Sequence, residues 1–252
     1  MAIQKSEGII LRRQDLRETS LILNIYTRDF GKIKGIVRGV RGSRAQYGGA
    51  SLEIFALDEI VFYERKHADI YTISQCDLLD FFYPIRSSLD KLAYANYIVE
   101  LIDSVTTLGD KNIEAYSLLL NSLKLLSGDS SPRRVTRIFE IKLLHLLGLM
   151  PTLGQCANCG IKMDADAKFS FTHGGLICRK CFGAGADKYA RPILQGTVKF
   201  IEHIRSSPFE KVARVKVALE VGRELEEILR KFLDFHIERR LKTLEFIKEI
   251  EK

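Results

Sequence analysis

Four of the five cysteines in this 252-residue chain fall into one spaced pattern that could bind a metal ion. Cys156 and Cys159 form one CxxC pair, and Cys178 and Cys181 form a second pair after eighteen intervening residues. Each pair can direct two thiolates to one side of a tight turn, so the two pairs can surround one tetrahedral ion. Four protein ligands leave no open coordination position. We therefore expect structural Zn²⁺ rather than a catalytic metal.

Two other uses of these cysteines stay open. Disulfides need an oxidising compartment, but the N-terminal residues contain no apolar core of the kind found in secretion signals. A redox dithiol needs one CxxC pair, whereas this chain has two. The apolar runs are far too short to span a bilayer. These features favour a cytosolic metal-binding protein, in which Cys76 is an ordinary thiol.

Positive charge is the second functional signal. The formal net charge is +7, which permits a polyanionic partner without proving one. Between residues 28 and 44, six cations accompany a single acid, Asp29. A cationic strand and loop suit a phosphate backbone because each neutralised phosphate releases counterions, although a solvated strand face explains the pattern as well. The predicted DNA-binding residues are Lys32, Lys34, Arg38, Arg41 and Arg44.

A second basic cluster lies where a helix is expected to begin. Ser131 and Pro132 are typical of an N-cap and a first helical position. Cations in the next turn oppose the helix dipole, so an anionic partner such as a phosphate or an acidic peptide would explain them. An interdomain salt bridge or a plain surface cluster would explain them as well. The predicted partner-binding residues are Arg133, Arg134 and Arg137.

The first 80 residues have the pattern of a small β-barrel. Short runs of β-forming residues alternate with Gly-rich or polar turns. We expect Ile33 and Val37 to face the core and Lys32 and Lys34 to face outward. An OB-type barrel is the simplest arrangement, and an SH3-like barrel fits nearly as well. The predicted strands are residues 8–13, 20–28, 32–40, 52–64 and 70–74.

The remaining residues have mainly helical periodicity. The expected fold class is therefore α+β, with an OB-fold domain over residues 1–80 and a helical domain over residues 81–252. A four-cysteine zinc module is inserted at about residues 153–182, and His173 is expected in a turn of its inner hairpin. The predicted helices are residues 85–107, 112–126, one that opens at Ser131-Pro132, 195–206 and 214–240.

No sequence motif indicates catalysis. The chain contains no phosphate-binding loop, dinucleotide-binding glycine motif, HExxH zinc-protease motif or GxSxG nucleophile motif. The predicted function is therefore not enzymatic, and no catalytic residue is assigned.

Several segments together resemble the RecO family of bacterial recombination mediators. The stretch most like the family is the basic hairpin of residues 27–41 (TRDFGKIKGIVRGVR), and the spaced cysteines resemble the family's zinc module. Thr243 stands where the resemblance leads us to expect a Ser. Some members lack the cysteines, so the metal does not define the function. The other resembling segments are residues 8–13 (GIILRR), 16–23 (LRETSLIL) and 237–244 (IERRLKTL).

The resemblance implies a role in recombinational DNA repair. Such proteins bind single- and double-stranded DNA and anneal complementary strands. They act with RecR to help load RecA onto DNA coated by single-stranded DNA-binding protein (SSB), whose acidic C-terminal tail they bind. A cytoplasmic, nucleoid-associated location follows from this role. The residues themselves leave two alternatives, a zinc-containing protein–protein adaptor and an RNA-modifying enzyme.

Overall fold

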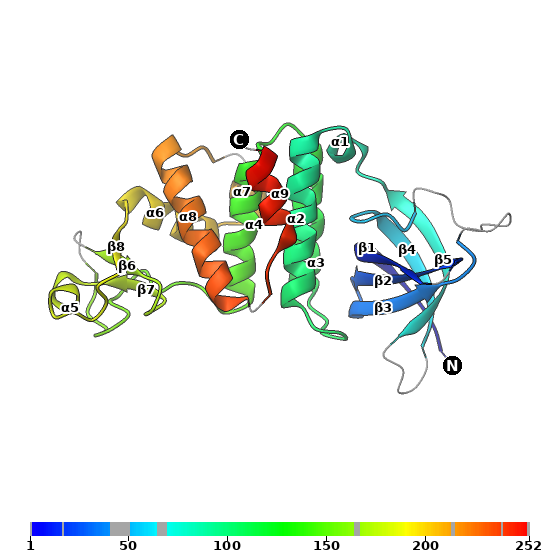
Figure 1. The fold of residues 1–252 in the computed structure, drawn as a ribbon, viewed down its shortest axis with the longest axis horizontal. Coiled ribbons are helices and arrows are strands. Elements are labelled where there is room, and N and C mark those ends of the chain that lie inside the picture. Colours follow the sequence, from blue (N-terminus) through cyan, green and yellow to red (C-terminus); the bar gives the residue numbers. More distant parts are fainter. Residues whose placement is uncertain are drawn as a thin grey trace. The chain divides into compact units, whose positions relative to one another are not determined.

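The computed structural model describes residues 2–16, 18–40, 51–64, 70–163, 167–212, 215–237 and 239–250. The chain divides into two compact units (Figure 1). The first unit contains Met1–Arg133 together with Leu241–Lys252, and the second unit contains Arg134–Arg240. The predicted boundaries at residue 80 and around residues 153–182 stay predictions. Among the described residues, no helix is both long and apolar enough to cross a membrane.

The N-terminal strands of the first unit form a closed barrel in the order β1-β2-β3-β5-β4. Neighbouring strands are antiparallel except for β3 and β5, which are parallel, and β4 closes the barrel against β1. This five-stranded arrangement is of OB type, so the OB prediction is confirmed. The strands are β1 (Ala2–Leu16), β2 (Ser20–Thr27), β3 (Gly31–Val37), β4 (Leu57–Glu64) and β5 (Tyr71–Asp80).

Several strand boundaries differ from the prediction: β3 ends at Val37 and not at residue 40, and β5 continues to Asp80 and does not end at residue 74. Two further differences have identifiable reasons. Strand β1 is much longer than expected because its first half pairs with β4 and its second half with β2. Strand β4 begins at Leu57 and not at residue 52, because Leu52 and Phe55 adopt left-handed backbone angles of φ 71° and 55°. Such angles interrupt an extended strand.

The barrel core follows the expected alternation. Ile33 and Val37 of β3 are 2% and 0% exposed, and they pack with Ile25 and Phe62. Gly35 lies between them in β3, where an added Cβ would come within 2.3 Å of Ile73 Cδ1. A larger side chain at this position would have to displace the Ile73 side chain.

The helices of the first unit are α1 (Tyr83–Arg86), α2 (Leu89–Val105), α3 (Ile113–Ser127) and α9 (Lys242–Ile250). Helix α9 packs against α2 although it comes from the end of the chain. The carboxylate of Glu100 in α2 accepts hydrogen bonds from the Lys242 and Thr243 amides and from Thr243 Oγ1. It thereby satisfies amides at the start of α9 that have no partner within the helix. A serine hydroxyl could make the same side-chain contact as Thr243.

The prediction of one helix over residues 214–240 is wrong. The chain forms α7 (Phe209–Val212) and α8 (Leu219–His236), leaves the helix at Ile237 and begins α9 at Lys242. The basic residues Arg239 and Arg240 therefore lie between two helices. The predicted apolar stripe of α8 is nevertheless buried: Leu225, Ile228, Leu229, Phe232 and Leu233.

The second unit combines helices with a small three-stranded sheet of order β7-β6-β8. A hairpin of β6 and β7 turns through Gly174, which has a φ of 65°. Phe169 of β6 contacts Phe232 of α8, with ring centroids 6.2 Å apart, and so joins the sheet to the helices. The remaining elements are α4 (Pro132–Leu146), β6 (Lys168–Ser170), β7 (Gly175–Ile177), α5 (Arg179–Gly183), β8 (Arg191–Pro192) and α6 (Gln195–Ser206).

Candidate metal centre and nucleic-acid interface

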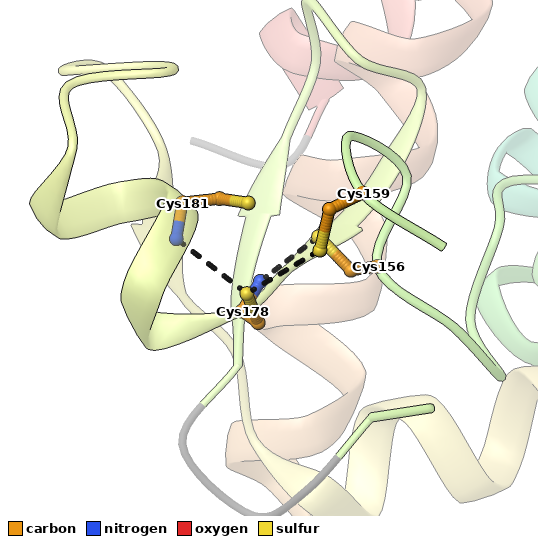
Figure 2. A group of neighbouring side chains, drawn as sticks. All are labelled: Cys156, Cys159, Cys178 and Cys181. Carbon is orange, nitrogen blue, oxygen red and sulfur yellow. Dashed lines mark hydrogen bonds between the residues drawn. The ribbon is translucent and has the colours of Figure 1, made fainter. Parts of the chain in front are cut away.

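The structure brings the four predicted cysteines together (Figure 2). All four Sγ atoms lie within 4.8 Å of one another, and Cys159 Sγ is 3.9 Å from Cys178 Sγ. A Zn–S bond of about 2.3 Å implies an S···S separation of about 3.8 Å in a tetrahedral site. The cluster therefore needs only a small contraction to bind a metal ion of this size.

Two local motifs position the sulfurs. Cys156 and Cys159 lie on a tight turn in which the Gly160 amide donates to the Cys156 carbonyl over 2.8 Å. Gly160 has a φ of 74°, a conformation that glycine adopts without steric cost. Cys178 caps the start of α5, where its Sγ accepts from the Cys181 amide over 3.5 Å. One pair thus sits on a turn and the other on the first turn of a helix.

Hydrogen-bond donors favour the thiolate form of Cys156; at Cys181 the Asn158 amide lowers the pKa, but the neighbouring cysteines and burial outweigh it and raise the pKa to about 12. Burial alone would raise the pKa of Cys156, but N–H groups of Cys178, Cys159 and Asn158 outweigh it and lower the pKa to about 6. The Cys178 amide lies 3.3 Å from Cys156 Sγ, and Asn158 Nδ2 donates to Cys181 Sγ over 3.3 Å. Metal ligation requires deprotonated cysteines, so this environment suits a thiolate-binding ion.

The inner hairpin of the cysteine module is held by polar contacts of its own. Ser170 Oγ donates to Asp187 Oδ2 over 2.6 Å and lies 3.0 Å from His173 Nδ1. The serine therefore bonds directly to the carboxylate, unlike a catalytic triad, in which histidine stands between them. His173 lies in the turn between β6 and β7, as expected, and is not part of the sulfur cluster.

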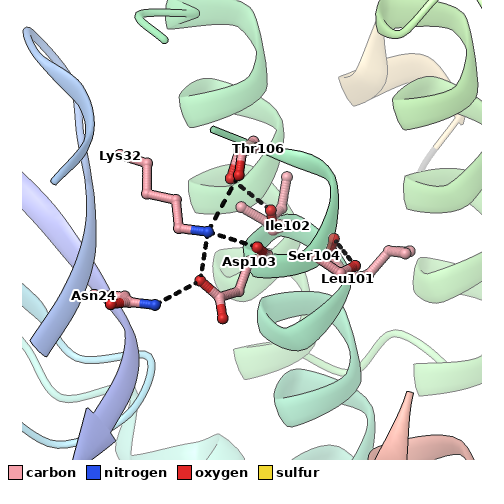
Figure 3. A network of polar contacts seen from close by, with 7 residues as sticks. All are labelled: Asn24, Lys32, Leu101, Ile102, Asp103, Ser104 and Thr106. Carbon is pink, nitrogen blue, oxygen red and sulfur yellow. Dashed lines mark hydrogen bonds and ion pairs between the residues drawn. The ribbon is translucent and has the colours of Figure 1, made fainter. Parts of the chain in front are cut away.

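The structure assigns Lys32 of the basic hairpin to an internal contact (Figure 3). Its ammonium group lies 2.7 Å from Asp103 Oδ1 and donates to the carbonyls of Asp103 and Thr106 over 2.6 and 3.2 Å. Asn24 of β2 donates to the same carboxylate over 3.0 Å. Lys32 is only 8% exposed. The prediction that this side chain faces a DNA backbone is therefore corrected, because α2 covers it.

The contact continues along the edge of β3. The Gly109 amide donates to the Lys32 carbonyl over 2.8 Å. An added Cβ at Gly31 would come within 2.1 Å of the Asp110 carbonyl oxygen. The loop between α2 and α3 thus lies directly against the start of β3, and only glycine fits at residue 31.

The other predicted DNA-binding residues differ in position. Lys34 is half-buried on the outward face of β3, and Arg38 is exposed just after the strand. Neither forms an ion pair or hydrogen bond with another side chain in the part of the chain that the structure describes. Arg41 and Arg44 lie outside the described residues.

The second basic cluster is also split by the structure. Arg133 is exposed and Arg134 half-buried, but Arg137 is 5% exposed. Arg137 Nη1 lies 2.6 Å from Glu140 Oε2, and its Nη2 lies 3.8 Å from Glu226 Oε1. The prediction of Arg137 as a partner-binding residue is therefore corrected, because its anionic partners are internal carboxylates.

Sequence reasoning missed the acidic members of these contacts. Asp103 lies in the last turn of α2, where a carboxylate opposes the helix dipole; this position was a signal that a cation lies nearby. Glu140 is a fully buried acid in the apolar stretch of α4. Asp58, also fully buried, faces the barrel interior. Burial raises its pKa to about 6; the Leu52 amide lowers it by less than burial raises it, and Asp77 adds a still smaller rise.

A closed OB-type barrel joined to helices and a four-cysteine cluster defines a class of OB-fold proteins with a metal-binding module. Residues 1–82 match the family described as Recombination protein O N terminal, and residues 86–245 match Recombination protein O C terminal. Proteins named DNA repair protein RecO are similar over nearly the whole chain. The protein of Moorella thermoacetica is 33% identical over 98% of this chain and 91% of its own length. That of Alkaliphilus metalliredigens is 32% identical over 98% and 99%.

The chain therefore belongs to the RecO family, and the predicted resemblance is confirmed. Membership assigns it to DNA repair and recombination. Members of this family are repair mediators rather than enzymes, which confirms the non-enzymatic prediction at the level of the family.

Proposed function

We propose that this chain is a recombination mediator that binds single- and double-stranded DNA and anneals complementary strands. With RecR it helps load RecA onto single-stranded DNA coated by SSB, in the cytoplasm at the nucleoid. The observation that carries the proposal is the family match over both parts of the chain, combined with an OB-type barrel. OB barrels commonly bind single-stranded nucleic acid through one face and its loops.

On this proposal, the protein promotes annealing through electrostatic interactions with the two DNA strands. Two complementary strands repel each other, and cations on the protein screen that repulsion while the bases stay free to pair. Lys34 and Arg38 are the described hairpin cations available for phosphate contacts. Arg41 and Arg44, outside the described residues, stay proposed DNA-binding residues on their sequence alone. Lys32 acts instead as a positioning residue that fixes the hairpin to α2.

In this proposal, the four cysteines hold a structural Zn²⁺. Thiolate ligands select zinc and iron–sulfur clusters among the common metal centres, and four of them at CxxC spacing are typical of structural zinc. The ion would supply a cross-link between the turn at Cys156 and Cys159 and the start of α5. The residues of the module then hold the β6–β7 hairpin against α8 through Phe169.

The acidic SSB tail is proposed to dock at the start of α4. Arg133 and Arg134 offer guanidinium groups for its carboxylates. Arg137 no longer belongs to this proposed site. Binding of a tail peptide, measured by fluorescence anisotropy, should weaken in Arg133→Ala plus Arg134→Ala; unchanged binding would remove the site.

Salt-dependent binding of a dye-labelled single strand tests the DNA-binding core of the proposal. The binding constant falls as salt rises, and each lost phosphate contact reduces the magnitude of the slope of log K against log salt by about 0.7 for single strands. Lys34→Ala plus Arg38→Ala should therefore reduce the slope by about 1.4. The matched control is Lys124→Ala plus Lys248→Ala, which removes two exposed lysines elsewhere in the first unit. No binding by the unaltered protein at low salt would contradict the proposal and favour the adaptor hypothesis.

A further inference from the structure

The strand register places the outward-facing side chains of the barrel in rows. Residues paired across neighbouring strands point to the same face, and the face alternates along each strand. Leu23, Ile25 and Ile33 belong to the barrel core, so the residues that alternate with them point outward. Three outward rows cross β1, β2 and β3: the first has Ile9, Tyr26 and Lys32, the second Arg12, Asn24 and Lys34, and the third Gln14, Ile22 and Ile36.

Helices of the same unit cover the first row. Lys32 binds the end of α2, and Tyr26 Oη donates to the Asn112 carbonyl at the start of α3 over 3.4 Å. Tyr26 is fully buried. Asn24 of the second row points toward the Asp103 carboxylate of α2 as well (Figure 3). OB barrels commonly bind oligonucleotides on the face of β2 and β3, and α2 and α3 close one end of that face here.

The open part of this face begins with two cations in the second row. Arg12 of β1 is exposed and Lys34 of β3 is half-buried, one on each side of Asn24. Neighbouring strands lie about 4.8 Å apart, so the two Cα atoms are about 10 Å from each other. With the Gln14 amide oriented toward the guanidinium, its oxygen accepts from Arg12 Nη2 and Nε over 2.8 and 3.1 Å. This partner is neutral, and neither cation forms an ion pair with another described residue.

The residue types of the open rows indicate which part of a nucleic acid they contact. The second and third rows contain no acid, and Ile22 and Ile36 form a half-buried apolar strip beside the two cations. The single aromatic side chain in the three rows is Tyr26, which α3 covers. Barrels that bind bases do so mainly by stacking them on exposed aromatic rings. Cations without such a ring favour the phosphates.

We infer that Arg12 is a DNA-contact residue, and that a single strand crosses β1, β2 and β3 over the second and third rows with its phosphates on Arg12 and Lys34. This inference rests on the proposed DNA-binding function and deepens it. The strand passes beside α2 because the first row is closed. Phosphate contacts read no sequence, and they leave the bases free to pair with a second strand, which annealing requires.

The test compares two arginine variants of the full-length protein, one at each end of this face. Arg12→Ala removes the proposed contact. Arg28→Ala removes an exposed arginine at the covered end, where its Nη1 lies 3.9 Å from Glu7 Oε2 and Glu7 also accepts from Tyr116 of α3. Binding to a dye-labelled, mixed-sequence single strand is measured over a salt series. Arg12→Ala should reduce the magnitude of the slope of log K against log salt by about 0.7, whereas Arg28→Ala and Arg12→Lys should leave it nearly unchanged.

The outcomes separate this inference from the proposed function. If the unaltered protein binds DNA and Arg12→Ala has the same slope, the Arg12 contact is refuted while DNA binding stands. If Arg12→Ala and Arg28→Ala reduce the slope equally, the effect is one of net charge and the contact is also refuted. No binding by the unaltered protein at low salt overturns the proposed function, and this inference with it.

A strand of the same length with abasic sites in place of its bases identifies the atoms that Arg12 contacts. Because the contact is to phosphate, Arg12→Ala should reduce the slope equally on the abasic strand and on the strand with bases. A reduction confined to the strand with bases would refute the phosphate contact. Unchanged circular dichroism of Arg12→Ala shows that the fold is retained.

Discussion

The OB barrel and the cysteine module are stabilised by different means. The barrel buries apolar side chains from all five strands, including Leu23, Ile25 and Phe62. The module has a far smaller buried cluster, which consists of Ile177, Ala190 and two of the cysteines themselves, Cys156 and Cys178. A core of this size stabilises little structure without a cross-link. We therefore expect folding of the module, but not of the barrel, to depend on a metal ion bound by the four cysteines.

The largest expected effect comes from breaking the metal site. Cys178→Ser removes a ligand and the cap of α5, and structural zinc contributes on the order of 10 kcal/mol to such sites. We expect loss of bound zinc, measured by elemental analysis, and fast hydrogen exchange in β6 and β7. Barrel amides should keep their protection. Loss of protection in β1 to β5 as well would contradict the independence of the barrel.

A buried ion pair in the barrel unit should give the next largest effect. Lys32→Ala leaves the Asp103 carboxylate buried without its cation, which costs about 3–5 kcal/mol. Lys34→Ala, two residues along the same strand face, should change the free energy of unfolding by less than about 0.5 kcal/mol. Urea denaturation compares the two variants. Equal losses of unfolding free energy in the two variants would show that Lys32 does not fix the basic hairpin to α2.

Lys32 and Lys34 also show why sequence reasoning succeeded for the cysteine module and failed for the basic hairpin. The cysteines lie within 26 residues, and their spacing alone specifies the turn and helix start that present the sulfurs. Lys32 has the same alternation as Lys34, so its outward orientation was predictable. Its acceptor, Asp103, is 71 residues away, and nothing in the sequence around Lys32 indicates that the helix of Asp103 packs there.

Other boundaries were missed for the same reason. The length of β1 depends on its pairing with β4, and the amides at the start of α9 bond to Glu100, which is 142 residues from Lys242. By contrast, helix α6 was predicted with its observed limits because its apolar stripe and polar flanks are local. The topology of the barrel needed the parallel pairing of β3 with β5, which the sequence pattern does not distinguish from an SH3-like order.

Asp58 offers a pH-dependent test of the barrel. Its folded pKa of about 6 lies above the unfolded value of 3.8, so the folded state binds the proton more tightly. Stability from this group is fully present below pH 3.8 and is lost as the pH rises through 6, by on the order of 3 kcal/mol. Asp58→Asn should therefore stabilise the protein at pH 8 and have little effect near pH 4. Thermal unfolding at both pH values measures this, and a uniform shift would contradict it.

The smallest predicted effect concerns the return of the C-terminal helix. Glu100→Ala removes the acceptor at the start of α9 and should cost about 1 kcal/mol, as for other helix caps. Thr243→Ser, which keeps the hydroxyl, should stay within about 0.5 kcal/mol of the unaltered protein. Chemical denaturation distinguishes the two, and equal stability of Glu100→Ala and the parent would exclude the capping role.

Annealing of two complementary, dye-labelled DNA strands, followed by energy transfer, tests the proposed mediator function directly. The strands are used bare and coated with SSB, over a salt series. The zinc-loaded protein should accelerate annealing on bare and on SSB-coated strands, and the acceleration should be lost as salt rises. Folded, zinc-loaded protein that leaves the annealing rate unchanged at low salt would contradict the mediator function.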